Sequence, residues 1–380
     1  MKITHIKVFH VNPAQHVADD KNLNLVYVKV YTDEGIDGLG EAFATSKAQT
    51  SEAALYDFER MLKGKDPTEV LRIWNTYHRS SRFPLGTVTT GALSAVEAAL
   101  WDITGKAAGL PIYKMLGGPV RDKIQVYRST SLDGIPAAIE RGFTGVKFSP
   151  QPDDYMDKPW MQVLDESVDR VRRARELVGP NVDIGLDWHG RSLSPHEPIQ
   201  FAKAVEQYRP MFLEEPVDTD TPASYAEIKA KTTIPIAGGE RTINREQMRE
   251  IMEHRAVHIF QPDPSACGGI METIRWGAVA EVHQIMLAPH NSLGPVQLAM
   301  SMHIDACVPN FLVQECNVNL DSQWVKDLFD YVPVIEDSFM KLSERPGLGI
   351  ELNEEAAEAY AFEPVDRKVV IERDGGIGLF

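Results

Sequence analysis

The sequence predicts an α/β protein: a (β/α)8-type, TIM-like barrel with an α+β capping domain formed by the N-terminal region and the C-terminal segment. From residue 124, short apolar runs alternate with helical patterns, giving eight predicted strands over about 200 residues. This alternation is absent before residue 119 and after residue 324. The rival arrangement, a doubly wound open sheet, is disfavoured because no Gly-x-Gly-x-x-Gly motif follows the first strand.

Three parts of the chain are predicted. Residues 1–118 are expected to form the capping unit, residues 119–324 the modified barrel, and residues 325–380 a segment that completes both. Two irregular segments, 11–23 and 80–90, are expected to be lids, because long loops in compact domains are often functional. The predicted elements of the capping unit are strands at 2–10, 24–32 and 36–41 and helices at 48–62, 67–79 and 90–108.

The barrel region follows from apolar runs of strand length between helical patterns. Its predicted strands are 124–129, 143–148, 182–187, 211–214, 234–239, 257–262, 285–289 and 311–315. Its predicted helices include 159–178, 196–207, 222–230, 244–254, 270–283 and 294–307.

Composition narrows the possible partners and compartment. With 39 Lys and Arg against 55 Asp and Glu the net charge is −16, which disfavours nucleic acid and anionic membranes as partners. No apolar run approaches the ~20 residues of a membrane span, and the N-terminus does not read as a signal peptide. Cys267, Cys307 and Cys316 are too few and too scattered for a disulfide framework, so a cytoplasmic protein is expected.

Six successive predicted strands end in ionisable side chains. Asp187, Glu214 and Glu240 follow the third, fourth and fifth strands. The carboxyl ends of barrel strands converge on one mouth, where three carboxylates would repel one another without a cation. Oxygen ligands with open coordination positions favour Mg²⁺ over Ca²⁺ or Zn²⁺. A single acidic strand end is more often a helix cap or a solvated residue, but six in succession favour a site.

The remaining strand ends predict acid–base chemistry. His290 and Asp263 follow adjacent strands, so that the carboxylate could orient the imidazole as a general base. His189 follows the third strand and is expected to face the substrate from the opposite side, as a proton donor to a leaving group. Glu315 ends the eighth strand and, if kept protonated, could donate a hydrogen bond to a substrate carboxylate or polarise it.

Three further charged residues have alternative interpretations. Lys147 ends the second strand and could contact the metal-site carboxylates or substrate, or be structural. Glu215 is expected to point away from Glu214 into an ion pair. Arg191 could bind a substrate carboxylate or pair with Glu215, and a substrate-binding role is preferred.

The chain resembles the enolase superfamily, in its mandelate racemase subgroup, and most of all the galactonate dehydratases. The resemblance covers nearly the full length. It is carried by DWHGR at 187–191, FLEEP at 212–216, GGER at 238–241, QPDPSACGGI at 261–270, APHNSLGP at 288–295 and VQE at 313–315, with further matches at 99–118 and 345–352.

The resemblance implies Mg²⁺ on Asp187, Glu214 and Glu240, and a His290–Asp263 dyad that removes the proton α to a carboxylate. A His at position 189 goes with dehydratases, in which it protonates the departing 3-hydroxyl to give a 2-keto-3-deoxy sugar acid. The lid segments are the expected specificity elements. A homo-oligomer and a small sugar-acid substrate, D-galactonate or a related aldonate, are also implied.

Two alternatives to a dehydratase stay open. The second strand carries one lysine, in KFSP, where the racemases of the subgroup have Lys-x-Lys, so a two-base racemase is disfavoured. An epimerase or cycloisomerase would share the proton abstraction but not the leaving group. A barrel that binds a sugar acid without turnover would have no need of two positioned histidines.

Overall fold

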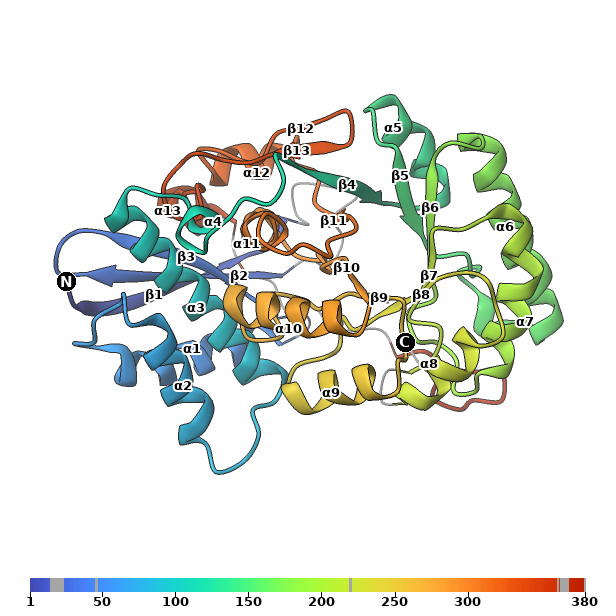
Figure 1. Cartoon of the computed structure of the whole chain (residues 1–380), viewed down its shortest axis with the longest axis horizontal. Helices are drawn as coiled ribbons and strands as arrows, with labels where there is room; N and C mark the ends of the chain where they lie inside the picture. Colours follow the sequence, from blue (N-terminus) through green and yellow to red (C-terminus); the bar gives the residue numbers. More distant parts are fainter. Residues whose placement is uncertain (14–23, 45–46, 219–220, 361, 363–368, 379–380) are drawn as a thin grey trace.

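The computed structural model describes residues 1–13, 24–44, 47–218, 221–360, 362 and 369–378 (Figure 1). The N-terminal unit is a three-stranded antiparallel sheet in the order β1-β2-β3, with helices packed against it. Its elements are β1 (Ile3–Val11), β2 (Leu25–Thr32), β3 (Asp37–Ala42), α1 (Ala48–Leu62), α2 (Val70–Ser80), α3 (Thr87–Ala108) and α4 (Ile112–Met115).

The structure describes the two predicted lid segments to different extents. Most of the segment 11–23 lies outside the described residues. The segment 80–90 is shorter than predicted, because α3 begins at Thr87. The Thr89 hydroxyl accepts a hydrogen bond from the Gly86 backbone N–H at 3.0 Å, and this local cap starts the helix earlier than the apolar pattern indicates.

Eight parallel strands form the predicted barrel. Each of the first six pairs with the next, and the eighth pairs with the first. A parallel bridge between Leu287 and Phe311 joins the seventh to the segment just before the eighth, and so closes the ring. The strands are β4 (Lys123–Ser129), β5 (Gly145–Phe148), β6 (Asp183–Asp187), β7 (Phe212–Glu214), β8 (Ile236–Gly238), β9 (Ile259–Phe260), β10 (Met286–Leu287) and β11 (Gln314–Cys316).

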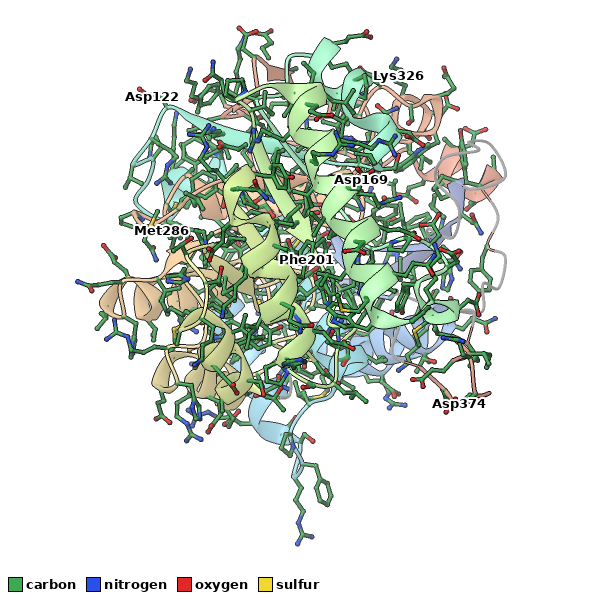
Figure 2. All side chains as sticks on the ribbon, turned by 90° about the vertical axis from the view of Figure 1, so that its right-hand side faces the viewer. Asp122, Asp169, Phe201, Met286, Lys326 and Asp374 are labelled. Carbon is green, nitrogen blue, oxygen red and sulfur yellow. The ribbon has the colours of Figure 1, made fainter. Side chains whose placement is uncertain are left out.

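Helices between the strands cover the outside of the barrel. Figure 2 looks onto two of them, α6 and α7, which carry the labelled Asp169 and Phe201. The helices are α5 (Ile135–Glu140), α6 (Trp160–Val178), α7 (His196–Val205), α8 (Pro222–Lys229), α9 (Arg245–Glu253), α10 (Ile270–Val282), α11 (Pro295–Asp305) and α12 (Gln323–Leu328). No helix among the described residues is long and apolar enough to cross a membrane.

The C-terminal segment contacts both other parts. Its hairpin, β12 (Ile335–Glu336) and β13 (Phe339–Lys341), adds to the outer edge of β4 by antiparallel pairing. Helix α13 (Glu354–Ala359) packs on β1, and Glu354 accepts hydrogen bonds from Lys29 and Tyr31 on β2. The domain divisions after residues 118 and 324 stay a prediction.

Hydrophobic burial follows this architecture. One cluster fills the N-terminal unit, and a larger one lies between the barrel strands and their helices. A third, small cluster fills the barrel interior with inward-facing side chains from six of the strands and the residues beside them. Its buried members are Tyr127, Phe212, Ala237, Ile259, Ala288 and Val313.

Candidate active site

The structure brings eight of the nine predicted site residues into one connected group at the carboxyl ends of the barrel strands. Every member lies within 4 Å of another through charged atoms. Arg191 is the exception. The eight are Lys147, Asp187, His189, Glu214, Glu240, Asp263, His290 and Glu315.

Lys147 connects the carboxylates of three strands. Its ammonium nitrogen lies 2.7 Å from Glu214 Oε1, 3.0 Å from Glu315 Oε1 and 3.3 Å from Asp187 Oδ2. Register explains the arrangement: Asp187 pairs with Glu214 between β6 and β7, and Lys147 is on β5, the neighbour of β6. Of the two interpretations of Lys147, the structure therefore favours the contact with the acidic residues.

Charge and burial act against each other here. Burial raises the pKa of Glu214 well above its usual range, and repulsion from neighbouring carboxylates adds to this although Lys147 opposes it. Burial would also raise the pKa of Asp187, but His189 and Lys147 outweigh it and hold the pKa at about 2. Burial lowers the pKa of the Lys147 ammonium, and its acidic neighbours reverse this and raise it well above the usual value.

His290 and Asp263 form the predicted pair. His290 Nδ1 lies 2.8 Å from Asp263 Oδ2, and Asp263 is fully buried. The other ring nitrogen, Nε2, is 3.4 Å from Glu240 Oε2 and 3.9 Å from Glu315 Oε2. Burial lowers the pKa of His290, but Glu240 and the Asp263 hydrogen bond outweigh it and raise the pKa to about 10. The His290 imidazole therefore lies between Asp263, which orients it, and the carboxylates of Glu240 and Glu315.

His189 reaches Asp187 by a different route from the one that the sequence suggests. Strand β6 ends at Asp187, so strand alternation does not extend to His189. Instead His189 adopts a left-handed backbone conformation, with φ of 58°. Its ring Nδ1 then lies 3.1 Å from Asp187 Oδ1, and the same oxygen accepts its backbone N–H at 3.0 Å. Non-glycine residues at positive φ are uncommon and concentrate at functional sites.

Glu215 forms an ion pair, as predicted, but its partner is Arg241. Arg241 Nε lies 3.6 Å from Glu215 Oε2 and 3.8 Å from Glu240 Oε1. Burial and Glu240 raise the pKa of Glu215 to about 8, although Arg241 lowers it. Arg241 also donates to the His189 backbone carbonyl at 2.7 Å, which ties the β6 and β8 loops together. The suggested pairing of Arg191 with Glu215 is therefore wrong.

Arg191 points toward the loop after β5. Its guanidinium donates to Ser149 Oγ at 3.4 Å and to Gln151 Oε1 at 3.2 Å, and lies over the Tyr155 ring. It borders a cavity of about 600 Å³ that the C-terminal residues 372–374 also line. The structure therefore gives Arg191 neutral hydrogen-bond partners at the rim of a cavity.

Sequence reasoning missed two residues that hold the group in place. Gln261 donates from Nε2 to Glu214 Oε2 at 3.0 Å, and Arg241 bridges the loops described above. Gln261 lies in the motif QPDPSACGGI and Arg241 in GGER, where the acidic residues Asp263 and Glu240 are the more obvious candidates. The signal for Gln261 is its spacing of two residues from Asp263, and that for Arg241 is its place directly after Glu240.

The donor chemistry fits a hard divalent cation. Asp187, Glu214 and Glu240 offer carboxylate oxygens, and the raised pKa of Glu214 comes first from burial and then from the charges of its acidic neighbours. Within the described ranges, no three acidic, His or Cys side chains are already gathered around one point as a metal site. The Lys147 ammonium lies between two of the three carboxylates, those of Asp187 and Glu214.

Comparisons with known proteins agree with this fold and arrangement. Residues 3–117 match the mandelate racemase / muconate lactonizing enzyme N-terminal domain, and residues 134–356 match the enolase C-terminal domain-like family. A D-galactonate dehydratase of Variovorax paradoxus is 34% identical, covering 99% of each chain. One of Pectobacterium atrosepticum is 36% identical, covering 93% of each. A crystal structure of an Agrobacterium radiobacter enolase, provisionally assigned as a galactarate dehydratase and bound to sodium and L-malate, has a TM-score of 0.91 at 30% identity, with full coverage of both chains.

These matches define the class of the protein, which is a hydro-lyase built from a barrel and an N-terminal capping domain. The chain belongs to the mandelate racemase / muconate lactonizing enzyme family of the enolase superfamily.

Replacing Arg241 tests the ion pair with Glu215. Arg241→Met leaves the buried Glu215 carboxylate without its cation. Above pH 8, where Glu215 is ionised in the native protein, we expect the free energy of unfolding to fall by about 1–3 kcal/mol, less than for a fully buried pair because the guanidinium is partly exposed. Urea unfolding in the presence of a chelator measures it. Arg191→Met, whose partners are neutral, is the control, and its expected cost is under about 1 kcal/mol. Equal costs for the two variants would contradict the assignment.

Proposed function

We propose that this protein catalyses the Mg²⁺-dependent dehydration of a sugar acid, D-galactonate or a related aldonate, to a 2-keto-3-deoxy sugar acid. One observation carries the proposal: two histidines, His290 and His189, follow different strands and contact carboxylates of the same group. A base that removes a proton and an acid that protonates a leaving group are the two groups that dehydration requires. The D-galactonate dehydratases with 34–36% identity support the substrate class.

Asp187, Glu214 and Glu240 would hold Mg²⁺, which when bound supplies positive charge that stabilises the dianion formed by proton loss beside a carboxylate. Gln261 would keep Glu214 oriented through its 3.0 Å hydrogen bond. Lys147 would contact the substrate carboxylate, since its ammonium already bridges acidic groups there. Glu315, in its protonated form, would donate a hydrogen bond to the same carboxylate.

His290 is the proposed base. Asp263 accepts the hydrogen bond of Nδ1–H, so that Nε2 faces the reacting carbon. The imidazole must be neutral to accept a proton, and the pKa of about 10 reflects the negative charge of Glu240 beside it. Compensating that charge lowers the pKa toward the working range of a base.

His189 is the proposed acid. The proton removed from the α carbon stays on His290, while His189 gives its own proton to the departing 3-hydroxyl, which leaves as water. The resulting enol tautomerises to the keto acid. Asp187 and the Arg241 contact to its backbone carbonyl fix the position of His189. Arg191, at the rim of its cavity, would contact the far end of the sugar acid.

A substrate panel tests the reaction directly. The protein is incubated with Mg²⁺ and a set of aldonates and aldarates, and 2-keto-3-deoxy acids are detected as semicarbazones. We expect at least one aldonate to react, and a chelator to stop the reaction until Mg²⁺ is restored. NMR of the product distinguishes dehydration from epimerisation or cycloisomerisation. If no acid of the panel gives a keto acid, the proposal fails.

His290→Asn should abolish proton abstraction. In deuterated water we expect the native enzyme to exchange the α-proton of its substrate, and we expect the variant to lose this exchange by about 10²–10⁴-fold, the usual contribution of a general base. His254→Asn, on a solvent-exposed histidine at the end of α9, is the matched control and should behave as native. Persistent exchange in His290→Asn would identify another base.

His189→Asn separates the two proton transfers. Because His290 and Asp263 are untouched, we expect α-proton exchange to continue while formation of the keto acid falls by about 10²–10⁴-fold. Proton NMR follows both in one sample. Unchanged dehydration would remove the acid role from His189, and loss of both processes would mean that its contact with Asp187 matters for binding instead.

A further inference from the structure

Two carboxylates of the N-terminal unit contact the helices that follow the Asp263 and His290 loops. Helix α10 begins at Ile270, after the Asp263 loop, and α11 begins at Pro295, after the His290 loop. Figure 1 shows α3 and β3 of the N-terminal unit beside these helices, with which they are in contact. The contacts involve Glu41 on β3 and Glu97 on α3.

Glu41 holds the helix after His290. It is fully buried, and its Oε1 accepts the Gly294 backbone N–H while its Oε2 accepts that of Gln297, both at 2.8 Å. The Gln297 side chain then turns back to the loop. It accepts the Leu293 N–H at 2.9 Å and donates to the His290 carbonyl at 3.4 Å. Glu41 is therefore linked to the backbone of His290 through one residue, Gln297.

Glu97 holds the helix after Asp263 in the same way. Its Oε2 accepts the Ile270 N–H at 2.8 Å, and its Oε1 accepts the Met271 N–H at 3.0 Å. One turn earlier on α3, the Ser94 hydroxyl accepts the Gly268 N–H at 2.9 Å. Asp263 Oδ1 accepts the Ser265 N–H at 2.8 Å at the start of the same loop. The loop is therefore fixed at both ends.

Both helices lack a cap of their own. Their first N–H groups need acceptors, and the residues at the capping positions, Gly269 and Gly294, have no side chain to provide one. Space explains the glycines: a Cβ would lie 2.2 Å from Glu97 Oε2 at Gly269 and 2.7 Å from Glu41 Oε1 at Gly294. The partial positive charge at each helix start also favours a carboxylate.

We propose that Glu41 and Glu97 are positioning residues through which the N-terminal unit sets the geometry of the Asp263–His290 pair. Each places a loop that carries one member of the pair, so the 2.8 Å hydrogen bond between the two depends on how that unit is docked. The role of the pair as the base rests on the proposed function. The placement of the loops does not.

Hydrogen–deuterium exchange tests the placement without any substrate. In Glu41→Gln one carboxylate oxygen becomes an N–H₂ group, so one of its two donors loses its acceptor. We expect the backbone amides of peptides covering 291–300 to exchange about tenfold faster or more, and those covering 268–275 to do so in Glu97→Gln.

Asp102→Asn is the matched control. Asp102 is also a buried carboxylate of α3, but it accepts the Leu39 and Leu348 N–H groups, at 2.9 and 2.8 Å, away from both loops. Its variant should change exchange around these two residues and leave 291–300 as in the native protein. Unchanged exchange in Glu41→Gln and Glu97→Gln, or the same change at 291–300 in Asp102→Asn, overturns the placement. If Glu41→Gln does not fold, Glu97→Gln and Ser94→Ala make the same test on the Asp263 loop.

Kinetics then test the effect on the base. With a substrate from the panel, Glu41→Gln and Glu97→Gln should lower kcat by roughly 10–100-fold while KM stays nearly constant, as expected for a misplaced reacting group. Full kcat in both variants overturns the positioning role. If no acid of the panel reacts with the native enzyme, the proposed function fails, and the exchange experiment still decides the placement.

Discussion

The buried ammonium of Lys147 is the interaction on which the arrangement of the barrel mouth depends. It has 2% exposure and lies between the carboxylates of Asp187, Glu214 and Glu315, which come from three strands. Burying charges costs several kcal/mol for each ion, and mutual attraction offsets this only with good geometry. A group of this composition is weak evidence for stability. Under the proposed function, the group serves to bind Mg²⁺ and the substrate carboxylate side by side.

The backbone supplies this geometry by two means. Within the strands, parallel register pairs Asp187 with Glu214, and pairs Lys147 on the neighbouring strand with Gly185, two residues before Asp187. Beyond the strand ends, His189 and Glu215 take left-handed conformations, with φ of 58° and 45°. The Arg241 contacts to the His189 carbonyl and to Glu215 keep these two turns together. These turns direct the His189 imidazole toward Asp187 and the Glu215 carboxylate toward Arg241.

The difference between the strands and the turns beyond them also separates what the sequence could predict from what it could not. The eight strands, most of the helices and the acids at the strand ends follow from local periodicity, since alternation holds as far as Asp187 and Glu214. The pairing of Glu215 with Arg241, where Arg191 was the candidate, depends on turns that have no period. The early start of α3 depends on a single threonine hydroxyl.

The contacts of Glu41 and Glu97 lie still further from sequence reasoning, because each joins residues more than 170 positions apart. Adjacent glycines at 268–269 look like an ordinary turn, and Gly294-Pro295 like an ordinary helix start. The carboxylate at each capping position leaves no room for a side chain there, and at Gly294 the Tyr27 hydroxyl also occupies that space. A barrel alone would leave these helix starts without acceptors. The N-terminal unit therefore completes the barrel at the two loops that carry Asp263 and His290.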